Sequence, residues 1–589
     1  MKKIIDLLQK EVTNAFTAKG YDARYGAVTL SNRPDLCQYQ CNGALAAAKE
    51  YKKAPIMIAQ DVLPILEESP LFVDVKAIMP GFINLNINPE FLAGYLEKMK
   101  VSGHYGVEKA EHPKTIIIDY GGPNVAKPLH VGHLRSAVIG EAIKRICRFA
   151  GHNVIGDVHL GDWGLQMGLI ITELKKRQPE LVYFDPAFEG EYPAEAPFTI
   201  AELEEIYPTA NAYAKEHPEY MEEAHNATYE LQNGNRGYAA LWNHIINVSV
   251  NDLKRNYKNL NVEFDLWKKE SDAQPYIPDM VKYMKEEGYA HLSEGALVVD
   301  VKEEGDTREI PPCMILKSDG ATLYNTTDLA TIVEREKLFH PDLILYVVDK
   351  RQELYFEQVF RCAKKTKIIR DEAELKFLGF GTMNGRDGKP FKTRDGGVMR
   401  LEHLISDINE AVYQKIMENR EMPEAEAREI ASKVGVAALK YGDLSNQASK
   451  DYVFDTDRFA SFEGNTGPYI LYTIVRIKSI LNKYREITGQ EPGRKKISAA
   501  LSESELALML ELSKFNDMVE SAYEEKAPHK VCQFIYELSN AFNKFYHETK
   551  ILAEEDKEKQ DSWIGLISLV VAVLNTCIEL LGMEAPDRM

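Results

Sequence analysis

Two histidines, His130 and His133, stand three residues apart at the end of a segment rich in glycine and proline, DYGGPNVAKPLHVGH at 119–133. A short β-branched run, TIIIDY at 115–120, precedes the two histidines and is typical of a buried parallel strand. An amphipathic pattern that ends at Gly151 follows them and predicts a helix. The start of such a helix offers free backbone N–H groups and the positive end of the helix dipole, so it can bind an anion.

Two imidazole N–H donors at that helix start suit a triphosphate, whose charge grows as a nucleotidyl group is transferred. Residues three apart share one side of a helix, so both rings can face the same phosphate. Gly132 lies between them and, having no side chain, lets a ligand approach the backbone. Two structural histidines or a metal-binding pair are the alternatives, and the position between a strand and a helix favours the phosphate.

The elements around this segment predict the fold class. HNVIGDVHL at 152–160 forms a second strand, so strand, loop, helix and strand make a βαβ unit. Further strand candidates are ALVVD at 296–300, CMILK at 313–317 and LILYVVD at 343–349, interleaved with helical patterns. The centre of the chain is therefore expected to be a doubly wound α/β domain with a parallel sheet.

Three domains are expected along the chain. Residues 1–110 read as a small α+β domain, with helical patterns followed by two strand-like runs. Residues 111–400 hold the α/β domain, which carries an acidic helical insertion around 175–235. Residues 401–589 read almost entirely as amphipathic helices, which predicts an all-α helical bundle.

The composition argues against a non-specific nucleic-acid-binding protein, a disulfide-bonded protein and a membrane protein. The 589 residues include 71 basic and 90 acidic side chains, a net charge of −19, which argues against non-specific coating of nucleic acid but allows a local basic groove. Seven scattered cysteines form no CxxC pair, which indicates reduced thiols in a cytoplasmic protein without a structural metal. The apolar stretch at 563–581 contains Asn575, Thr576 and Glu579, so we interpret it as a buried helix and expect no membrane contact.

HVGH at 130–133 resembles the HIGH signature of class I aminoacyl-tRNA synthetases. Longer blocks, GPNVAKPLHVGHLRSAVIGEAI and HLGDWGLQMG, resemble the arginyl-tRNA synthetases in particular. Near the end of the chain, FEGNTGPYILYTIVRI and GMEAPDRM are similar to the anticodon-binding domain of that family. The resemblance covers nearly the whole chain. It implies a Rossmann-like catalytic domain whose substrate pocket lies at the carboxyl ends of its strands.

The resemblance also implies the reaction. ATP, with Mg²⁺, and L-arginine would give arginyl-adenylate, and the arginyl group would then pass to the 3′ end of tRNA(Arg). The family commonly needs tRNA for the activation step, and we expect the same here. We expect the protein to act as a monomer.

The second signature of the class, KMSKS, is irregular in this chain. The corresponding segment at 385–404, GRDGKPFKTRDGGVMRLEHL, lacks the full lysine spacing. ATP-binding candidates in it are Lys389, Lys392, Thr393 and Arg394, with Lys392 as a catalytic cation. In the family a lysine three residues before the first histidine is thought to substitute for the missing charge, and here that residue is Lys127.

A guanidinium substrate needs carboxylates in a partly dry pocket. By their match to the family pattern, Glu270, Tyr324 and Asp328 would bind the guanidinium, whereas Asn124 and Gln352 would bind the amino-acid end. In HLGDWG, we expect His159, Asp162 and Trp163 to form walls of the same cleft, and the resemblance places this segment near the adenosine and the activated amino acid. The alternative is a tight turn with Trp163 packed in the core.

Contacts with RNA are expected from local features. The helical pattern at 468–485 interleaves aromatic and basic residues, among them Tyr469, Tyr472 and Arg476, which suit stacked bases and phosphates. In the first domain, Gln40 lies in a segment that resembles the family's contact with the tRNA elbow. Two alternative functions stay open: a class I synthetase for another amino acid, and a catalytically inactive paralogue that binds tRNA or senses arginine.

Overall fold

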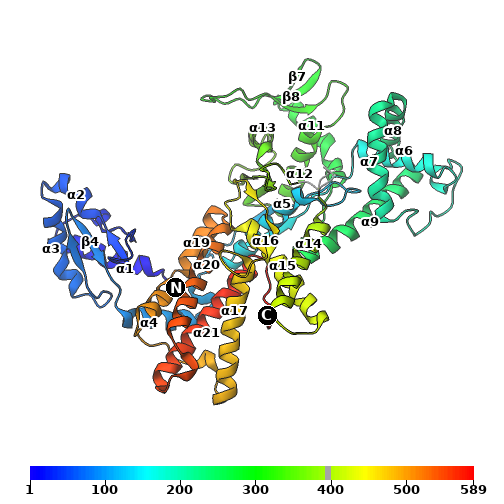
Figure 1. Cartoon of the computed structure of the whole chain (residues 1–589). Helices are drawn as coiled ribbons and strands as arrows, with labels where there is room; N and C mark the ends of the chain where they lie inside the picture. Colours follow the sequence, from blue (N-terminus) through cyan, green and yellow to red (C-terminus); the bar gives the residue numbers. More distant parts are fainter. Residues whose placement is uncertain (392–398) are drawn as a thin grey trace. The chain divides into compact units, whose positions relative to one another are not determined.

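A computed structural model describes residues 1–391 and 399–589 of the chain. The chain folds into two compact units (Figure 1). One unit holds Ala110–Pro468 together with Leu580–Glu584. The other holds Met1–Lys109, Tyr469–Glu579 and Ala585–Met589.

A parallel sheet forms the centre of the first unit. Its strand order is β11-β10-β5-β6, and every neighbouring pair is parallel. The strands are β5 (Thr115–Tyr120), β6 (Asn153–Asp157), β10 (Leu343–Asp349) and β11 (Glu374–Phe380). Helix α5 (Val131–Phe149) connects β5 to β6 on one side, whereas β10 pairs with β5 on the other. The doubly wound α/β fold is therefore confirmed, and a crevice is expected where the strand order reverses between β5 and β10.

Two of the expected strands lie outside this parallel sheet. Strands β8 (Ala296–Val299) and β9 (Cys313–Leu316) pair antiparallel with each other, and β7 (Ala290–Ser293) completes a separate three-stranded sheet. One face of this sheet packs on a buried cluster while residues such as Leu292 and Met314 stay exposed, which is typical of an antiparallel sheet. Strand β11, at the edge of the parallel sheet, was not anticipated because ELKFLGF is only half-buried and carries a lysine and a glycine.

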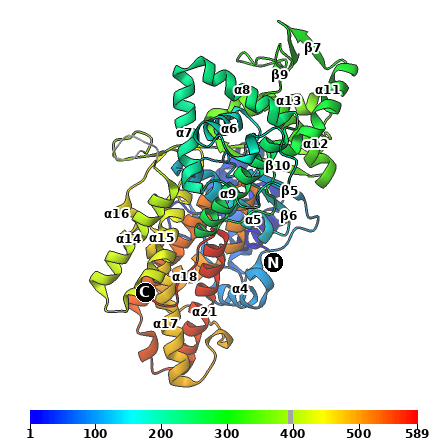
Figure 2. The same cartoon turned by 90° about the vertical axis from the view of Figure 1, so that its right-hand side faces the viewer.

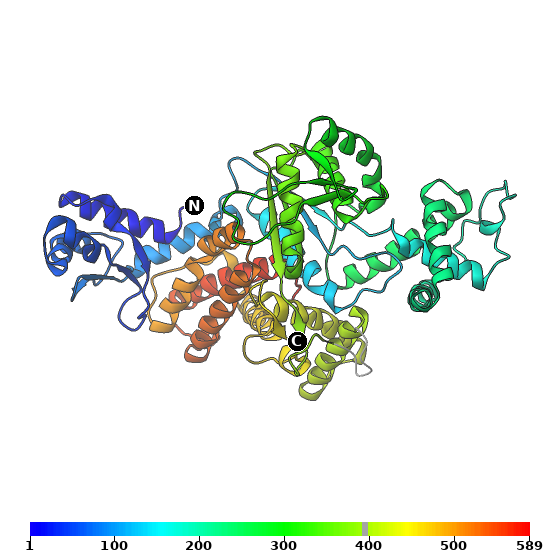
Figure 3. The same cartoon turned by 90° about the horizontal axis from the view of Figure 1, so that it is seen from above.

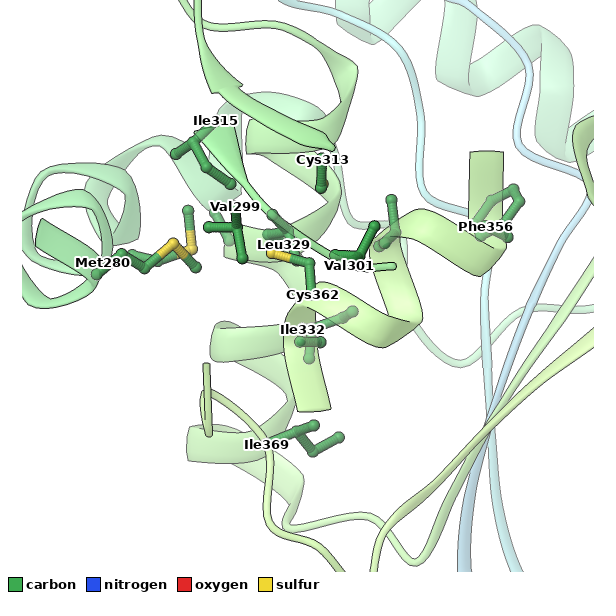
Figure 4. Close-up of a cluster of buried hydrophobic side chains, with 14 of the residues drawn as sticks. Met280, Val299, Val301, Cys313, Ile315, Leu329, Ile332, Phe356, Cys362 and Ile369 are labelled. Atoms are coloured by element: carbon green, nitrogen blue, oxygen red, sulfur yellow. The ribbon is translucent and has the colours of Figure 1, made fainter. Parts of the chain in front are cut away.

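The buried cluster joins the small sheet to two helices of the α/β fold. Figure 4 shows Val299 and Cys313 from the sheet facing Leu329 on α12 (Tyr324–Phe339) and Cys362 on α13 (Glu353–Lys365). All four side chains are fully buried. Tight packing on this cluster holds α12 in place, and α12 begins at the crevice.

The acidic insertion is helical, as expected. It follows α6 (Leu165–Arg177) and contains α7 (Ile200–Glu216) and α8 (Pro218–Gln232), before α9 (Arg236–Asn259) returns to the sheet. Figure 3 shows these helices, in cyan and teal, standing off from the green helices around the sheet. Leu169, Ala210 and Ala224 are among the residues of their small core.

Residues after 400 begin with two helices that belong to the unit of the parallel sheet, α14 (Leu401–Asn419) and α15 (Glu424–Leu444). The buried guanidinium of Arg135 on α5 binds the Asp443 carboxylate at 3.1 Å and ties α15 to the sheet. A two-residue strand at Tyr452–Val453 also follows residue 400, although the sequence showed no strand signal there. The domain boundaries at 110 and 400 stay a prediction.

The second unit combines the ends of the chain. Near the N-terminus, an antiparallel sheet of order β1-β2-β4-β3 is accompanied by the expected helices α1 (Ile4–Ala18), α2 (Gly43–Tyr51) and α3 (Pro55–Glu67). Its strands are β1 (Val28–Leu30), β2 (Tyr39–Cys41), β3 (Lys76–Ile78) and β4 (Phe82–Leu85). Helix α4 (Pro89–Val101) then meets the C-terminal part of the unit, where the Lys100 ammonium donates to the Lys495 carbonyl at 2.6 Å.

The C-terminal part of this unit is a helical bundle. Its long helices are α17 (Gly467–Thr488), α20 (Pro528–Glu548) and α21 (Lys557–Leu580). Helices α17 and α21 lie side by side (Figure 2), and the Tyr484 hydroxyl donates to Asp561 at 2.7 Å. Among the described residues α21 is the one helix long and apolar enough to span a membrane, with a mean hydropathy of 2.0. Its apolar window is 72% buried inside the bundle, in agreement with its interpretation as a core helix.

Candidate active site

The start of α5 presents the two histidines as expected. His130 is the N-cap residue, and its Nδ1 accepts the Gly132 N–H at 3.0 Å. His133 reaches back, and its Nδ1 accepts the His130 N–H at 3.2 Å. This reciprocal capping brings the two ring centroids within 3.9 Å of each other. A Cβ on Gly132 would lie 2.8 Å from the His130 ring, so this geometry requires glycine.

Both imidazoles are neutral, and each can donate a hydrogen bond from its Nε2. Each Nδ1 accepts a backbone N–H, so in the neutral ring the proton sits on Nε2. The pKa of His133 is lowered to about 3, chiefly by burial and to a smaller extent by the nearby His130 and Lys127. Burial and Lys127 also lower the pKa of His130. The helix start therefore offers two Nε2–H donors without an added positive charge.

The end of the irregular basic segment lies against this helix start. The Val131 N–H donates to the Met399 carbonyl at 3.1 Å, and the Leu401 N–H donates to the Leu129 carbonyl at 2.9 Å. Lys389, in the same segment, is exposed in a tight turn closed by the Gly385 N–H and the Lys389 carbonyl. The other expected ATP-binding residues of this segment, Lys392, Thr393 and Arg394, lie outside the described residues.

The loops after β5 and β6 pair with each other at the carboxyl ends of these strands. The Val125 N–H donates to the Gly161 carbonyl at 2.9 Å, and the Gly161 N–H donates to the Pro123 carbonyl at 3.2 Å. A Cβ on Gly161 would meet the Asn124 Oδ1 at 2.0 Å, so glycine is required where Asn124 crosses. This pairing brings Asn124 to the same place as the HLGDWG segment.

A cavity of about 500 Å³ opens where these loops meet. Five of the expected site residues line it and come from four stretches of the chain: Asn124, Lys127, Trp163, Glu270 and Tyr324. Residues that the sequence did not suggest complete the lining, and the helix α7 supplies two of them, Tyr207 and Asn211. The cavity has the size of a small-molecule site.

Glu270 is the carboxylate that lines this cavity. It begins the short helix α10 (Glu270–Ala273), and its backbone N–H donates to the Leu160 carbonyl at 2.9 Å. The pKa of Glu270 is raised to about 7, chiefly by burial; the nearby His159 lowers it, whereas the carboxylates Asp162 and Asp328 add to the rise. A cationic ligand would restore the charge of this carboxylate, so the site favours a cation.

Asp162 and Trp163 are adjacent in sequence but only Trp163 lines the cavity. The buried Asp162 carboxylate accepts the Ser271 N–H at 3.0 Å and the Ser271 hydroxyl at 2.6 Å, so it fixes α10 rather than facing the cavity. Trp163 lines the cavity and packs edge-to-face on Trp242 with ring centroids 5.3 Å apart. Trp163 therefore combines a position in the cavity lining with packing on a neighbouring ring.

Asp328 and His159 lie behind the cavity lining. The Tyr355 hydroxyl donates to the Asp328 carboxylate, whose pKa burial raises. The His159 imidazole lies close enough to Glu270 and Asp328 to lower the pKa of both. Its Nδ1 is buried with no hydrogen-bond partner in the described part of the chain.

A second cavity, of about 230 Å³, is lined by residues of the α5 start. His130, Gly132, Arg135 and Arg351 are among the residues that line it, together with Gly381 and its neighbours after β11. Gln352 lines neither cavity and is exposed at the end of a short 3₁₀ turn. The expected role of Gln352 at the amino-acid end of arginine stays a prediction.

Comparison with known proteins agrees with this geometry. The family model "tRNA synthetases class I (R), catalytic domain" matches residues 96–456. "Arginyl tRNA synthetase N terminal domain" matches residues 2–87, and "DALR anticodon binding domain" matches residues 470–589. The chain belongs to the arginyl-tRNA synthetase family.

Members of the arginyl-tRNA synthetase family match this chain over their full length. An arginine–tRNA ligase of Agathobacter rectalis is 63% identical over 597 residues and one of Alkaliphilus oremlandii is 61% identical over 589 residues, each covering 100% of both chains. The crystal structure of an arginyl-tRNA synthetase from Plasmodium falciparum has a TM-score of 0.82 at 25% identity and covers 100% of both chains. The expected family and fold are confirmed.

The sequence did not predict a role for Arg335, a buried arginine on α12 behind the cavity. Arg335 on α12 binds the Asp119 carboxylate at 2.7 Å and the Asp157 carboxylate at 2.9 Å. These two aspartates end β5 and β6, and the Tyr346 hydroxyl of β10 accepts from the same guanidinium at 3.2 Å. Arg335 thus ties the helix that carries Tyr324 to the strand ends. No local pattern marks such a residue, because its partners are distant in sequence.

The expected tRNA-binding residues of α17 form one cluster with α20. The Tyr469 hydroxyl donates to Asn540 at 2.7 Å, and the Arg476 guanidinium donates to Asn543 at 2.6 Å. Arg476 also lies over the half-buried Tyr472 ring, 4.8 Å from its centroid. Gln40 lies in β2, apart from this cluster along the chain, where its side-chain amide donates to Asn84 at 2.9 Å.

Proposed function

We propose that this protein attaches L-arginine to tRNA(Arg) in two steps at the expense of ATP, as an arginine–tRNA ligase. The observation that carries the proposal is the 500 Å³ cavity, which is lined by both Glu270 and Lys127. Lys127 is also close enough to His130 and His133 for its charge to lower the pKa of both. The full-length identity of 63% to an arginine–tRNA ligase supports the same assignment.

Arginine binds with its guanidinium at the acidic end of this cavity. Glu270 pairs with the guanidinium, Tyr324 lines the cavity beside it, and Asp328 adds negative charge from behind. Asn124 binds the amino-acid end of the substrate near the α5 start. The carboxylate of arginine then points toward Lys127 and the histidines.

In the first step a carboxylate oxygen of arginine attacks the α-phosphorus of ATP, which enters as its Mg²⁺ complex. The new P–O bond gives arginyl-adenylate, and the bond to the β-phosphate breaks to release pyrophosphate. The Nε2–H groups of His130 and His133 donate to the phosphate oxygens, whose charge grows in the transition state. Lys127 neutralises further charge there, together with the basic segment at 385–404.

In the second step a ribose hydroxyl of the terminal tRNA nucleotide attacks the carbonyl carbon of the adenylate, and AMP leaves. The Tyr469, Tyr472 and Arg476 cluster binds the anticodon by stacking and charge, and Gln40 contacts the tRNA elbow. We further propose that the protein acts as a monomer in the cytoplasm. A single species of about 67 kDa in light scattering is the expected result for the monomer.

Charging of total tRNA with each of the twenty labelled amino acids tests the proposal. We expect charging with arginine alone and pyrophosphate exchange that requires tRNA. Charging with another amino acid indicates a different class I synthetase. Binding of tRNA or arginine with no exchange indicates an inactive paralogue, and either outcome contradicts the proposal.

A further inference from the structure

The first helix of the acidic insertion, α7, contacts the catalytic site at two points. Tyr207 and Asn211 of α7 line the larger cavity. Glu204 and Tyr207 are three residues apart and so lie on the same side of the helix. Each of these two side chains holds a cation that neighbours the α5 start.

The first contact is between Tyr207 and Lys127. The Lys127 ammonium lies over the Tyr207 ring, 4.6 Å from its centroid, within the range of a cation–π interaction. Lys127 precedes His130 by three residues, and its charge is felt by both histidines. The ring therefore holds the one lysine of the cavity lining that lies next to the paired imidazoles.

The second contact is between Glu204 and Arg400. The Arg400 guanidinium donates to the Glu204 carboxylate at 2.6 Å, and this carboxylate is only 9% exposed. The backbone on both sides of Arg400 is bonded to the backbone on both sides of His130, through Met399 and Leu401. Two further acids, Asp252 and Glu402, lie close to Glu204, so Arg400 is the cation that offsets a local excess of negative charge.

We propose that α7 is a positioning element of the nucleotide site, in which Tyr207 orients Lys127 and Glu204 orients Arg400. The insertion thereby fixes the positions of two positively charged side chains, Lys127 and Arg400, near the paired imidazoles. Placement within a fraction of an ångström matters because charge that is already in position lowers the barrier without reorganisation. This inference rests on the proposed function, since it assigns a role within that reaction.

Variants of Tyr207 test the first contact by tRNA-dependent pyrophosphate exchange. Tyr207→Ala is expected to lower kcat about tenfold, whereas the KM for arginine changes less than about twofold. Tyr207→Phe keeps the ring and should recover most of that loss. Tyr213→Ala is the matched control, because Tyr213 is on the same helix and its ring holds Lys176, 4.0 Å from the centroid and outside the lining of both cavities.

A double variant shows whether Tyr207 acts through Lys127. In a Lys127→Ala background, Tyr207→Ala should cause no further loss of kcat, because the group that it orients is gone. Full additivity of the two losses contradicts the proposal. An unchanged kcat in Tyr207→Ala contradicts it as well.

Glu204→Gln tests the second contact in the same assay. We expect kcat to fall about fivefold, and Arg400→Gln should cause a similar fall. In the double variant the two losses should not add, because each substitution removes the same contact. Glu205→Gln is the neighbouring control, since Glu205 is 68% exposed and pairs with Arg177 instead. Circular dichroism melts of each variant show whether it is folded, and equal losses in both glutamate variants contradict the role of Glu204.

The activity of the wild-type protein distinguishes a failure of the proposed function from a failure of the role assigned to α7. If it fails to exchange pyrophosphate with arginine and tRNA, the proposed function fails. If it exchanges normally while Tyr207→Ala and Glu204→Gln match their controls, only the role of α7 fails.

Discussion

The chemistry at the α5 start depends on imidazoles that stay uncharged. Both rings use Nδ1 to cap the helix, so each has an Nε2–H left for a ligand. A neutral donor strengthens its hydrogen bond as the phosphate gains charge, whereas an imidazolium would also bind ground-state ATP tightly. The residues that cap the helix start are therefore also the ones that we propose act in the transition state.

His133→Ala removes one of these donors. We expect kcat for pyrophosphate exchange to fall roughly 10²–10³-fold, because a donor that acts in the transition state is lost. The KM for arginine should change little. Exchange kinetics measure both constants, and His291→Ala, at an exposed histidine in the β7 strand, is the control. A wild-type kcat in His133→Ala would refute this role.

The raised pKa of Glu270 predicts a pH dependence of arginine binding. With a pKa of about 7, the carboxylate is mostly protonated at pH 6 and mostly ionised at pH 8. Arginine is a cation at both, so its KM should fall about tenfold over this range. Glu270→Gln should raise the KM and abolish its pH dependence. Glu287→Gln, an exposed control outside both cavities, should keep it.

The same group also links stability to pH. Glu270 has a higher pKa in the folded protein than the ordinary 4.5, so the folded state binds the extra proton. Its contribution to stability is complete below about pH 4.5 and is lost as the pH rises through 7. Glu270→Gln should therefore melt at a higher temperature than wild type at pH 8, with no difference at pH 4. A lower melting temperature at pH 8 contradicts this.

At the scale of elements, the site depends on how α12 is attached to the parallel sheet. Arg335 joins α12 to the ends of β5 and β6, the two strands whose loops carry Asn124 and Trp163. On the other side, the cluster of Figure 4 packs α12 against the small antiparallel sheet. Displacement of α12 would move Tyr324 and Asp328 together.

Arg335→Met leaves Asp119 and Asp157 without their buried partner. We expect a loss of about 3–5 kcal/mol in the free energy of unfolding, because two carboxylates stay buried without a counter-charge. Urea denaturation followed by fluorescence measures it. Arg428→Met is the control, since Arg428 pairs with Glu410 and Glu424 while 50% exposed and should cost less than about 1 kcal/mol. Equal costs for the two variants contradict the expected difference.

At the scale of the whole molecule, the residues proposed for the reaction and those proposed for tRNA binding belong to different compact units. The cavities and histidines lie in the unit that contains the parallel sheet, whereas Gln40, Tyr472 and Arg476 lie in the unit formed by both ends of the chain. If the basic aromatic cluster of α17 binds tRNA as proposed, it supplies a local basic surface on a chain whose net charge is −19. Damage to this cluster should leave the pocket for arginine intact.

Tyr472→Ala tests this separation. The KM for tRNA(Arg) should rise about tenfold through the loss of one stacking surface, with the KM for arginine unchanged. Aminoacylation at varied tRNA concentration measures it. Tyr413→Ala is the control, because Tyr413 also lies under an arginine, with Arg428 4.0 Å from its ring centroid, but in the other unit. A tRNA KM equal to that of wild type contradicts the anticodon contact.

The sequence by itself determined the features that depend on neighbouring residues. TIIIDY and HVGH predicted a strand, a loop and a helix start with paired imidazoles, because β-branched runs and capping act over a few residues. The acidic candidates of the pocket came from resemblance to a family, and the structure brought Glu270 and Tyr324 into one cavity with Asn124 but left Gln352 outside.

Only the tertiary structure decided the contacts between distant residues. Arg335 and Asp119 are 216 positions apart, and Arg400 and Glu204 are 196 apart. The assignment of β8 and β9 to a separate sheet likewise depends on strand pairing rather than on the composition of each strand. Such contacts form because packing of whole elements brings these side chains together, and no local pattern in the chain encodes which partner each one meets.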